Sequence, residues 1–405
     1  MSPVRALKDS EIVSYVRELR HSVRAHEKWR TKTTLNLIPS ENFASEETRS
    51  FLSTDLSNRY SARDHFYRGT RYADEVEALA VEVAKKLYRC KFADVRPLSG
   101  HTCSLIVFMS LLRPGNKVVT CPPEHGGYPG SSKLGLGPLL SLQNLYFPYD
   151  PTRMNILPKE TKSLLDSENP EMTVFGSSFI PFPYKISESL PDDYRGFRVY
   201  DGSHVMGLIA GGKFQDPLRE GCSILMGSTH KSLFGPQGGM LLSNDQEIFS
   251  KIDAKVYPGI VDNIHWNRVA ALTFAMLELL KFGRQYATQV IRNSKALASA
   301  LDDDVEVKCK DYGYTESHQV ILDYDEKKSV EIANLLQDLD IITDIGIRLG
   351  TAEITRRGMK ENEMVQIAEI LSDAINRKSS KERIRKRVHG LTSEFPGLEY
   401  TFSRD

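Results

Sequence analysis

The stretch ILMGSTHKSLFGPQGGMLL (residues 224–242) places one lysine, Lys231, between two apolar runs. The first run ends in small residues, and a glycine-rich bend with one proline leads into the second run. An amine becomes a nucleophile when its pKa is lowered, and a loop between buried strands offers the desolvation that lowers it. The pattern therefore predicts two buried strands joined by a loop with a reactive lysine. A solvated surface lysine is the alternative.

A phosphate-binding loop is a rival interpretation of Lys231 and Ser232. In that loop a glycine stands directly before the lysine, so that the backbone can wrap around a phosphate. His230 occupies this position in the chain. The sequence therefore excludes a nucleotide-binding loop of this type.

Two further motifs support a functional role for the lysine. In FRVYDGSHVMGLIAGG (residues 197–212) an apolar strand is expected to end at Asp201, and the carboxyl ends of parallel strands are where such sheets bind ligands. In RPLSGHTCSLIVFMSLL (residues 96–112) a turn of small residues precedes an apolar helix, whose free N–H groups and dipole favour a phosphate. Taken singly, each motif also fits an ordinary helix cap. In this chain order, the three motifs predict a site for pyridoxal phosphate (PLP), where the aspartate would keep the pyridine nitrogen protonated.

The wider pattern predicts an α/β fold with a mostly parallel sheet and helices on both faces. The apolar runs NKVVTCP, EMTVFGS, FRVYDGSH and CSILMGS alternate with helical stretches. The later segments HQVILDYD, SVEIANLLQDLD and GIRLGTAEITRRG predict a smaller α+β domain. We expect an N-terminal helix and arm over residues 1–70, a large PLP-binding domain over residues 71–275, and a small C-terminal domain over residues 276–405.

Composition favours an ordinary cytoplasmic enzyme. Lys plus Arg and Asp plus Glu both number 53, so no global charge points to nucleic acid or a membrane. The five cysteines are scattered and never form CxxC, which argues against disulfides and a zinc site, and no metal is expected. The charged start MSPVRALKDSE is unlike a signal peptide, and no apolar run could span a bilayer. The basic tract at residues 376–390 lacks aromatic residues, so we expect it to be the solvated face of a late helix.

Several motifs together resemble the serine hydroxymethyltransferase family over nearly the whole chain. LIPSENF (residues 37–43) resembles the family's Ser-Glu-Asn-Phe motif, and GSTHKSLFGPQGG (residues 227–239) resembles its cofactor-lysine segment. GIRLGTAEITRRGMKENEM (residues 346–364) resembles its substrate-carboxylate segment. GLIAGGKFQDPLREG (residues 207–221) is most similar to archaeal-type members. The resemblance implies a PLP enzyme of the aspartate aminotransferase fold type, fold type I.

The resemblance also implies roles for the residues that match the family's motifs. Lys231 would hold PLP covalently, Asp201 would pair with the pyridine nitrogen, and His204 would lie beside the phenolic oxygen of the cofactor. Ser40 and Arg357 would grip the substrate carboxylate, a task that suits the planar fork of an arginine. The other residues expected to bind the cofactor are Ser99, Gly100, His101, Tyr128, Ser178, Ser228 and His230.

A homodimer or tetramer with shared active sites is a further implication of the resemblance. Tyr60 and Tyr67 match tyrosines that, in the family, reach the substrate site across a dimer interface, and Tyr67 is also a candidate catalytic residue. The expected small-molecule partners are an amino acid and an aldehyde or one-carbon acceptor. Nucleic acid and membranes are not expected as partners.

Three departures from the family pattern bear on the reaction. In NRYSARDHFYRG (residues 58–69), Ala62 stands where the family has a glutamate that handles a substrate proton, and about three residues are missing. Tyr128 stands where the family stacks a histidine on the PLP ring. The stretch LDIITDIGIRLGT (residues 339–351) lacks an insert that contacts folate in the family. These changes are compatible with PLP chemistry on an amino acid, whereas tetrahydrofolate is not expected to be used.

The sequence thus predicts a PLP enzyme that acts on the Cα–Cβ bond of a serine- or threonine-like β-hydroxy amino acid. The versions left open are hydroxymethyl transfer, folate-free aldol or transaldol chemistry, and racemisation or oxidative decarboxylation at Cα. The reaction needs a base for the hydroxyl proton, and the candidates are His125, His204 and Asp64. A catalytically impaired family member kept for binding is the alternative from another class. The intact lysine, aspartate and arginine argue against it.

Overall fold

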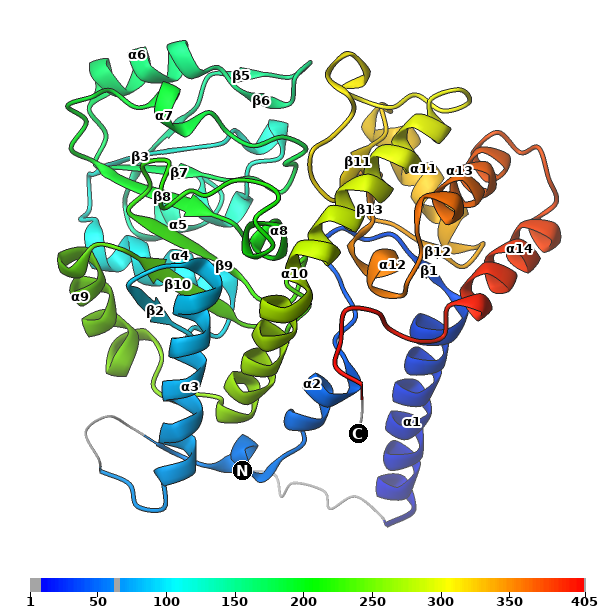
Figure 1. Ribbon diagram of the computed structural model, residues 1–405, viewed down its shortest axis with the longest axis horizontal. Coiled ribbons are helices and arrows are strands. Elements are labelled where there is room, and N and C mark those ends of the chain that lie inside the picture. The colour runs from blue at the N-terminus through cyan, green and yellow to red at the C-terminus, as the bar shows by residue number, and fades with distance from the viewer. Residues whose placement is uncertain (1–8, 62–65, 404–405) are drawn as a thin grey trace, which may run out of the picture.

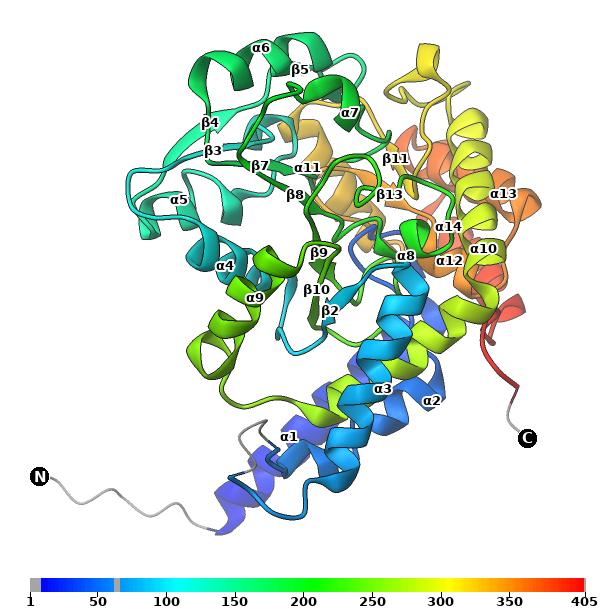
Figure 2. The ribbon, with the colours of Figure 1, turned by 60° about the vertical axis from the view of Figure 1, so that its left-hand side comes forward.

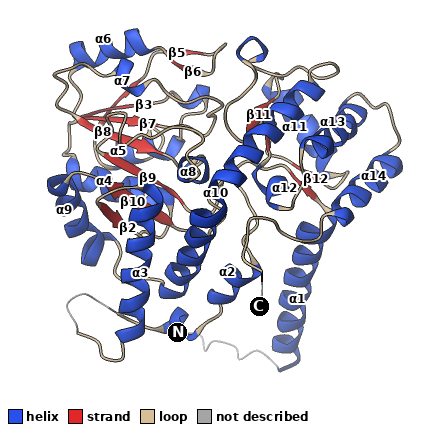
Figure 3. Ribbon diagram, viewed as in Figure 1, coloured by secondary structure: helices blue, strands red, loops and turns tan. Residues whose placement is uncertain are grey.

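The computed structural model describes residues 9–61 and 66–403 (Figure 1). A larger part around the central sheet lies beside a smaller part that contains the C-terminal helices (Figure 3). Two separate clusters of buried hydrophobic residues form the cores of these parts. Across the described ranges, none of the helices combines the length and the apolar character that crossing a membrane requires.

The larger part is built on a sheet with the strand order β2-β10-β9-β8-β7-β3-β4. Neighbouring strands from β9 to β4 are parallel, whereas β10 is antiparallel to both β2 and β9. The strands are β2 (Phe92–Asp94), β3 (Lys117–Thr120), β4 (Gln143–Tyr146), β7 (Met172–Phe175), β8 (Phe197–Asp201), β9 (Ile224–Ser228) and β10 (Gly239–Ser243). The sequence-based prediction of an α/β fold with a mostly parallel sheet is confirmed, and its four apolar runs form β3, β7, β8 and β9.

Helices cover both faces of this sheet, because strands that are buried on each side need two apolar layers against them. Figure 2 shows α4 and α9 on one side of β2, β9 and β10, with α3, α8 and α10 on the other. The helices of this part are α2 (Glu46–Phe51), α3 (Arg71–Tyr88), α4 (Gly100–Leu111), α5 (Leu136–Leu139), α6 (Pro158–Glu168), α7 (Ile186–Ser189), α8 (Met206–Ala210), α9 (Gln246–Lys255) and α10 (Trp266–Leu301). A short hairpin joins β5 (Tyr149–Asp150) to β6 (Asn155–Ile156). Short helical turns are η2 (Asp55–Asn58), η3 (Pro123–His125), η4 (Pro129–Ser131), η5 (Val256–Ile260) and η6 (Lys310–Tyr312).

The long helix α10 connects the two parts. Its residues up to Val290 pack in the larger core, and from Leu297 onward they pack in the smaller core. The expected domain boundary after residue 275 falls inside this continuous helix, so the division into domains stays a prediction. The remaining elements are β11 (Gln319–Ile321), α11 (Glu326–Gln337), β12 (Ile341–Ile342), β13 (Arg348–Gly350), α12 (Ala352–Arg356), α13 (Glu361–Ile375) and α14 (Lys381–Glu394). Most of the basic tract lies on α14, the late helix that the sequence predicts.

The N-terminal segment joins the smaller part but leaves its first helix uncovered. β1 (Leu35–Asn36) pairs in parallel with β12, which brings Leu35 into the smaller core. Before it lie α1 (Asp9–Lys28) and η1 (Trp29–Thr33), and α1 has no buried residue. The apolar residues of α1 are all exposed, namely Ile12, Val13, Tyr15, Val16, Leu19 and Val23. Figure 1 shows α1 projecting away from both cores.

Candidate active site

Lys231 lies in the loop between β9 and β10, as the sequence predicts. The two strands are antiparallel, with Ser228 opposite Gly239, and every residue in them is buried. The loop backbone is held from outside, because Asn42 Nδ2 donates to the Lys231 carbonyl at 3.0 Å and Tyr286 Oη donates to the Ser232 carbonyl at 2.9 Å. The amine therefore extends from a fixed backbone.

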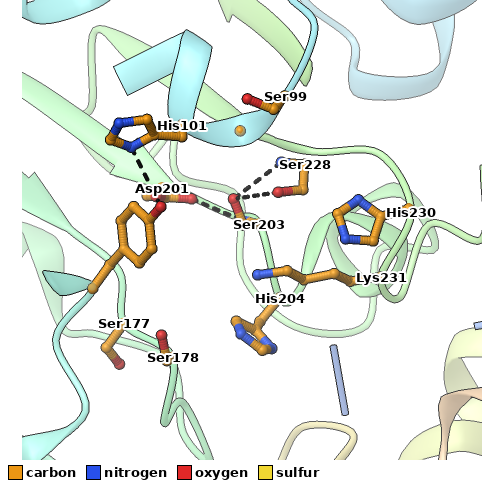
Figure 4. Close-up of a pocket in the computed structure, with 12 residues that line it drawn as sticks. Ser99, His101, Ser177, Ser178, Asp201, Ser203, His204, Ser228, His230 and Lys231 are labelled. Carbon is orange, nitrogen blue, oxygen red and sulfur yellow. Dashed lines mark hydrogen bonds between the residues drawn. The ribbon is translucent and has the colours of Figure 1, made fainter. Parts of the chain in front are cut away.

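The lysine side chain enters a cavity of about 250 Å³ at the carboxyl ends of β8 and β9 (Figure 4). The lining residues are Ser99, Gly100, His101, Tyr128, Ser177, Ser178, Asp201, Ser203, His204, Ser228, His230 and Lys231. Burial lowers the pKa of the Lys231 amine to about 8, with a smaller lowering from the charge of Arg348 and an opposing effect of Asp201. The structure therefore provides the desolvated amine that a nucleophilic lysine requires.

Asp201 is the last residue of β8, next to β9 in the parallel part of the sheet. Its Oδ1 accepts a hydrogen bond from the Ser203 backbone N–H at 2.9 Å, which orients the carboxylate at the wall of the cavity. A carboxylate at this place can pair with a protonated ring nitrogen. It thus has the position that the sequence predicts for the partner of the PLP pyridine.

Another part of the cavity wall, at the start of α4, is suited to a phosphate. Ser99 caps α4, with its hydroxyl accepting from Thr102 N–H at 3.0 Å, and Gly100 and His101 of the first turn line the cavity. The first N–H groups of a helix have no partner within it and favour an anion. The Ser203 hydroxyl accepts from Ser228 N–H at 3.0 Å, and the two serine hydroxyls lie 3.3 Å apart. A Cβ at Gly100 would clash with the Ser228 hydroxyl, so the backbone approaches this closely only with glycine. Hydroxyls, helix N–H groups and a glycine turn are the donor set that a phosphate requires, so the residues present fit PLP.

Histidines occupy three sides of the same cavity. His204 is buried, and Figure 4 shows its ring below the Lys231 side chain with His230 on the other side. Burial, and then the charge of Lys231, lower the pKa of His230 to about 4. His101 Nδ1 lies 3.3 Å from the hydroxyl of Tyr128, which occupies the position of the family's stacking histidine. Because its pKa is lowered to about 4, His230 is uncharged at neutral pH.

Other residues singled out from the sequence do not line this cavity. Arg357 is bound to Glu353 Oε1 at 3.1 Å and to the Thr31 carbonyl at 3.1 Å. Ser40 is half-buried on the N-terminal segment. The ring of His125 stacks on Tyr149 at a centroid distance of 4.7 Å.

The two tyrosines expected at a shared site also lie away from the cavity of their own chain. Tyr60 and Tyr67 stack on each other with ring centroids 4.9 Å apart, and they are 52% and 38% exposed. Ala62 and the candidate base Asp64 lie outside the described residues.

Among the residues that sequence reasoning did not single out, Ser177 and Ser203 line the cavity, and Arg348 and Gln319 contact residues that line it. Ser203 stands between Asp201 and His204 in the chain, so its position two residues after the aspartate is the signal that could have found it. Arg348 belongs to the quoted GIRLGT motif, donates to the Ser178 carbonyl and pairs with Asp344 Oδ2 at 2.8 Å. Gln319, on β11, contacts His204 from a site 115 positions away in the chain, and no local pattern points to it.

A lysine loop and an aspartate at the ends of neighbouring strands, facing a glycine-serine helix start, define the class of PLP-dependent enzymes of fold type I. Within this class the chain belongs to the serine hydroxymethyltransferase family, whose model, described as "Serine hydroxymethyltransferase", matches residues 13–371. The chain is 38% identical to the serine hydroxymethyltransferase of Methanocaldococcus jannaschii, over 97% of this chain and 96% of that protein. It is 36% identical to that of Pyrococcus abyssi, over 94% of this chain and 96% of that protein.

A solved structure extends the comparison beyond the archaeal relatives. The L-threonine transaldolase of Pseudomonas fluorescens, crystallised in its internal aldimine state, superposes with a TM-score of 0.89 at 25% identity, over 97% of this chain and 95% of that one. The resemblance to the family and to its archaeal members is thereby confirmed, as are fold type I and the PLP cofactor. The protein is a PLP-dependent enzyme that acts on hydroxy amino acids.

Proposed function

We propose that the protein breaks or forms the Cα–Cβ bond of a serine- or threonine-like β-hydroxy amino acid, with an aldehyde or a one-carbon unit as the second reactant. The observation that carries this proposal is the cavity in which a desolvated lysine, a strand-end aspartate and a phosphate-type donor set face one another. When bound, PLP supplies an electron sink for the pair released at Cα. Similarity to both serine hydroxymethyltransferases and a threonine transaldolase supports chemistry at this bond.

The chain's own residues would divide the remaining tasks among them. With its pKa lowered to about 8, Lys231 has a sizeable unprotonated fraction near neutral pH and would be the covalent attachment point. Asp201 would hold the proton of the pyridine nitrogen. The hydroxyls of Ser99, Ser203 and Ser228, with the N-terminus of α4, would hold the phosphate.

We infer that Arg348, rather than Arg357, binds the substrate carboxylate. The Arg348 side chain reaches the Ser178 carbonyl at the cavity wall, and its charge lowers the pKa of both Lys231 and His204. Its contacts with Asp344 and Ser178 use only part of its five N–H donors, so the guanidinium can still accept a carboxylate. Arg357 is instead committed to the buried carboxylate of Glu353 in α12, the helix that it directly follows.

We further infer that tetrahydrofolate is not the acceptor. Only residues 343–347 separate β12 from β13, which leaves a short connection where the family has an insert that contacts folate. Alanine at position 62 has no proton to transfer in place of the family's glutamate. An aldehyde acceptor, as in a transaldol reaction, would need neither feature.

One experiment tests the reaction and the acceptor together. The PLP-loaded protein is incubated with serine, threonine and other β-hydroxy amino acids, with and without tetrahydrofolate, and released aldehyde is measured. We expect aldehyde to be released without folate, and we expect no release from a Lys231→Ala control. A large dependence on folate would show an ordinary hydroxymethyltransferase, and loss of CO₂ or inversion at Cα without aldehyde would move the chemistry to Cα.

We propose, finally, a homodimer in which each partner completes the other's site. The exposed apolar residues of α1 form a helix face of the kind that marks an interaction surface, and the exposed Tyr60–Tyr67 pair lies away from the cavity of its own chain. Mixing inactive Tyr67→Phe and Lys231→Ala subunits should restore part of the activity through hybrids. A fully active monomer in light scattering would refute the dimer.

A further inference from the structure

Gln319 is a fully buried side chain on β11 that contacts His204. Its Oε1 accepts a hydrogen bond from Ile180 N–H at 2.9 Å, and its Nε2 donates to the Ser178 carbonyl at 3.0 Å. Because a backbone N–H can only donate and a carbonyl can only accept, these two contacts together fix the orientation of the amide. The second hydrogen of Nε2 is then available to His204 Nδ1, which lies 3.1 Å away.

This contact determines which ring nitrogen of His204 carries the proton. Since Gln319 Nε2 is the donor, His204 Nδ1 must be the acceptor, and the proton of the neutral ring must lie on Nε2. His204 lines the cavity, and within the described ranges the hydrogen bond of its ring is the contact of Nδ1 with Gln319. We propose that Gln319 is a positioning residue that fixes His204 as the neutral Nε2–H tautomer, a permanent hydrogen-bond donor to the PLP cavity.

The charges around His204 reinforce this arrangement. Burial lowers the pKa of His204 well below its usual range, and the positive charges of Lys231 and Arg348 act in the same direction, as do His318 and His230 when they are protonated. The neighbouring ring of His318 lies 5.8 Å away, nearly parallel, and its Nε2 donates to the Pro39 carbonyl at 3.0 Å. The cations and rings near His204 thus all oppose a second proton on it, while Gln319 selects the position of the first.

A fixed donor has a definite chemical use next to PLP. An N–H at this position can hold an anionic oxygen of the cofactor or the substrate, and it cannot remove a proton, because the lone pair on Nδ1 is occupied by Gln319. His204 is then excluded as the base for the substrate hydroxyl, which leaves His125 and Asp64 among the sequence candidates. The inference rests on PLP as the cofactor and holds for any of the reactions at Cα or Cβ.

The tautomer can be read directly from the ¹⁵N resonances of the ring in protein labelled on histidine, both without and with PLP. His204 is assigned through a His204→Asn variant. In the unsubstituted protein we expect a protonated Nε2 and an unprotonated Nδ1 that do not titrate near neutral pH. In Gln319→Glu the new carboxylate only accepts, so the proton should move to Nδ1. In Gln319→Leu, which removes the donor, we expect both tautomers to be populated.

A matched control separates this role from general loss of a buried amide. Gln215 is also buried and bonds Tyr184, Tyr200 and Glu220, away from His204. Gln215→Leu should leave the His204 resonances unchanged, and PLP should dissociate on the order of tenfold faster from Gln319→Glu than from Gln215→Leu. A protonated Nδ1 in the unsubstituted protein, or an unchanged tautomer in both Gln319 variants, would overturn the proposal. Both results are independent of whether aldehyde is released, so they do not depend on the proposed reaction.

Discussion

Arg348 and Arg357 belong to one short segment of the smaller part, yet their surroundings differ, and we propose different roles for them. Arg357 lies against the Phe43 ring, with its guanidinium carbon 4.8 Å from the centroid, and is bound to the buried carboxylate of Glu353. Arg348 reaches the cavity wall and acts electrostatically on Lys231. The two residues have the same chemistry and lie in the same motif, so the partners of an arginine decide whether it is free to bind a ligand.

The largest effect is expected on the stability of the fold when Arg357 is replaced. Arg357→Ala leaves Glu353 buried without its cation, and burial already raises the pKa of that carboxyl. We expect the free energy of unfolding to fall by about 3 kcal/mol or more in urea denaturation. Adding Glu353→Gln should recover much of this loss because it removes the stranded charge. If Arg357→Ala were fully stable but bound amino acids poorly, the carboxylate role would return to Arg357.

The proposed role of Arg348 is tested by the affinity for the amino-acid substrate. Arg348→Ala should weaken amino-acid binding roughly 30- to 150-fold, or about 2–3 kcal/mol, because a charge-assisted contact is lost. Arg348→Lys should recover only part of the lost affinity, since an ammonium lacks the planar fork of a guanidinium. Both are measured by titrating the visible absorption of the PLP-loaded protein with amino acids. Normal affinity in Arg348→Ala would remove Arg348 from the site.

The sequence predicts those parts of the site that local patterns encode. Asp201 ends a strand, Ser99 caps a helix and Lys231 lies in the loop that follows a strand. Such positions can be read from the alternation of apolar runs and small residues. The choice between Arg348 and Arg357 depends on side-chain partners such as Glu353 and Thr31. The role of Gln319 depends on a contact across 115 positions of the chain. Contacts of these two kinds leave no periodic signal, so only the folded structure reveals them.

A smaller effect should come from His318, beside the cavity. Burial lowers its pKa to about 3, from an ordinary value of 6.5. Between these values the unfolded chain binds more protons than the folded one, so the free energy of unfolding falls as the pH drops. His318→Gln can still donate to the Pro39 carbonyl but does not titrate, so it should remove about 2 kcal/mol of the decrease between pH 7 and pH 5. An unchanged pH slope in urea denaturation would mean that His318 is protonated in the folded state.

The smallest effect is expected in the rate at which PLP-free protein captures the cofactor. The unprotonated amine reacts, and the pKa of Lys231 is lowered to about 8. The capture rate should therefore rise about fivefold from pH 7 to pH 8 and level off above pH 9. A rate that keeps rising tenfold per pH unit beyond pH 9 would indicate a lysine with an ordinary pKa and a solvated environment.

We propose above that Lys231, in its loop between β9 and β10, holds PLP covalently. Borohydride reduction of the PLP-loaded protein, followed by proteolysis and mass mapping, tests it most directly. We expect a phosphopyridoxyl label on the peptide that contains Lys231 and none on that peptide from Lys231→Ala. A label on another lysine, or protein that stays colourless when PLP is added, would contradict it.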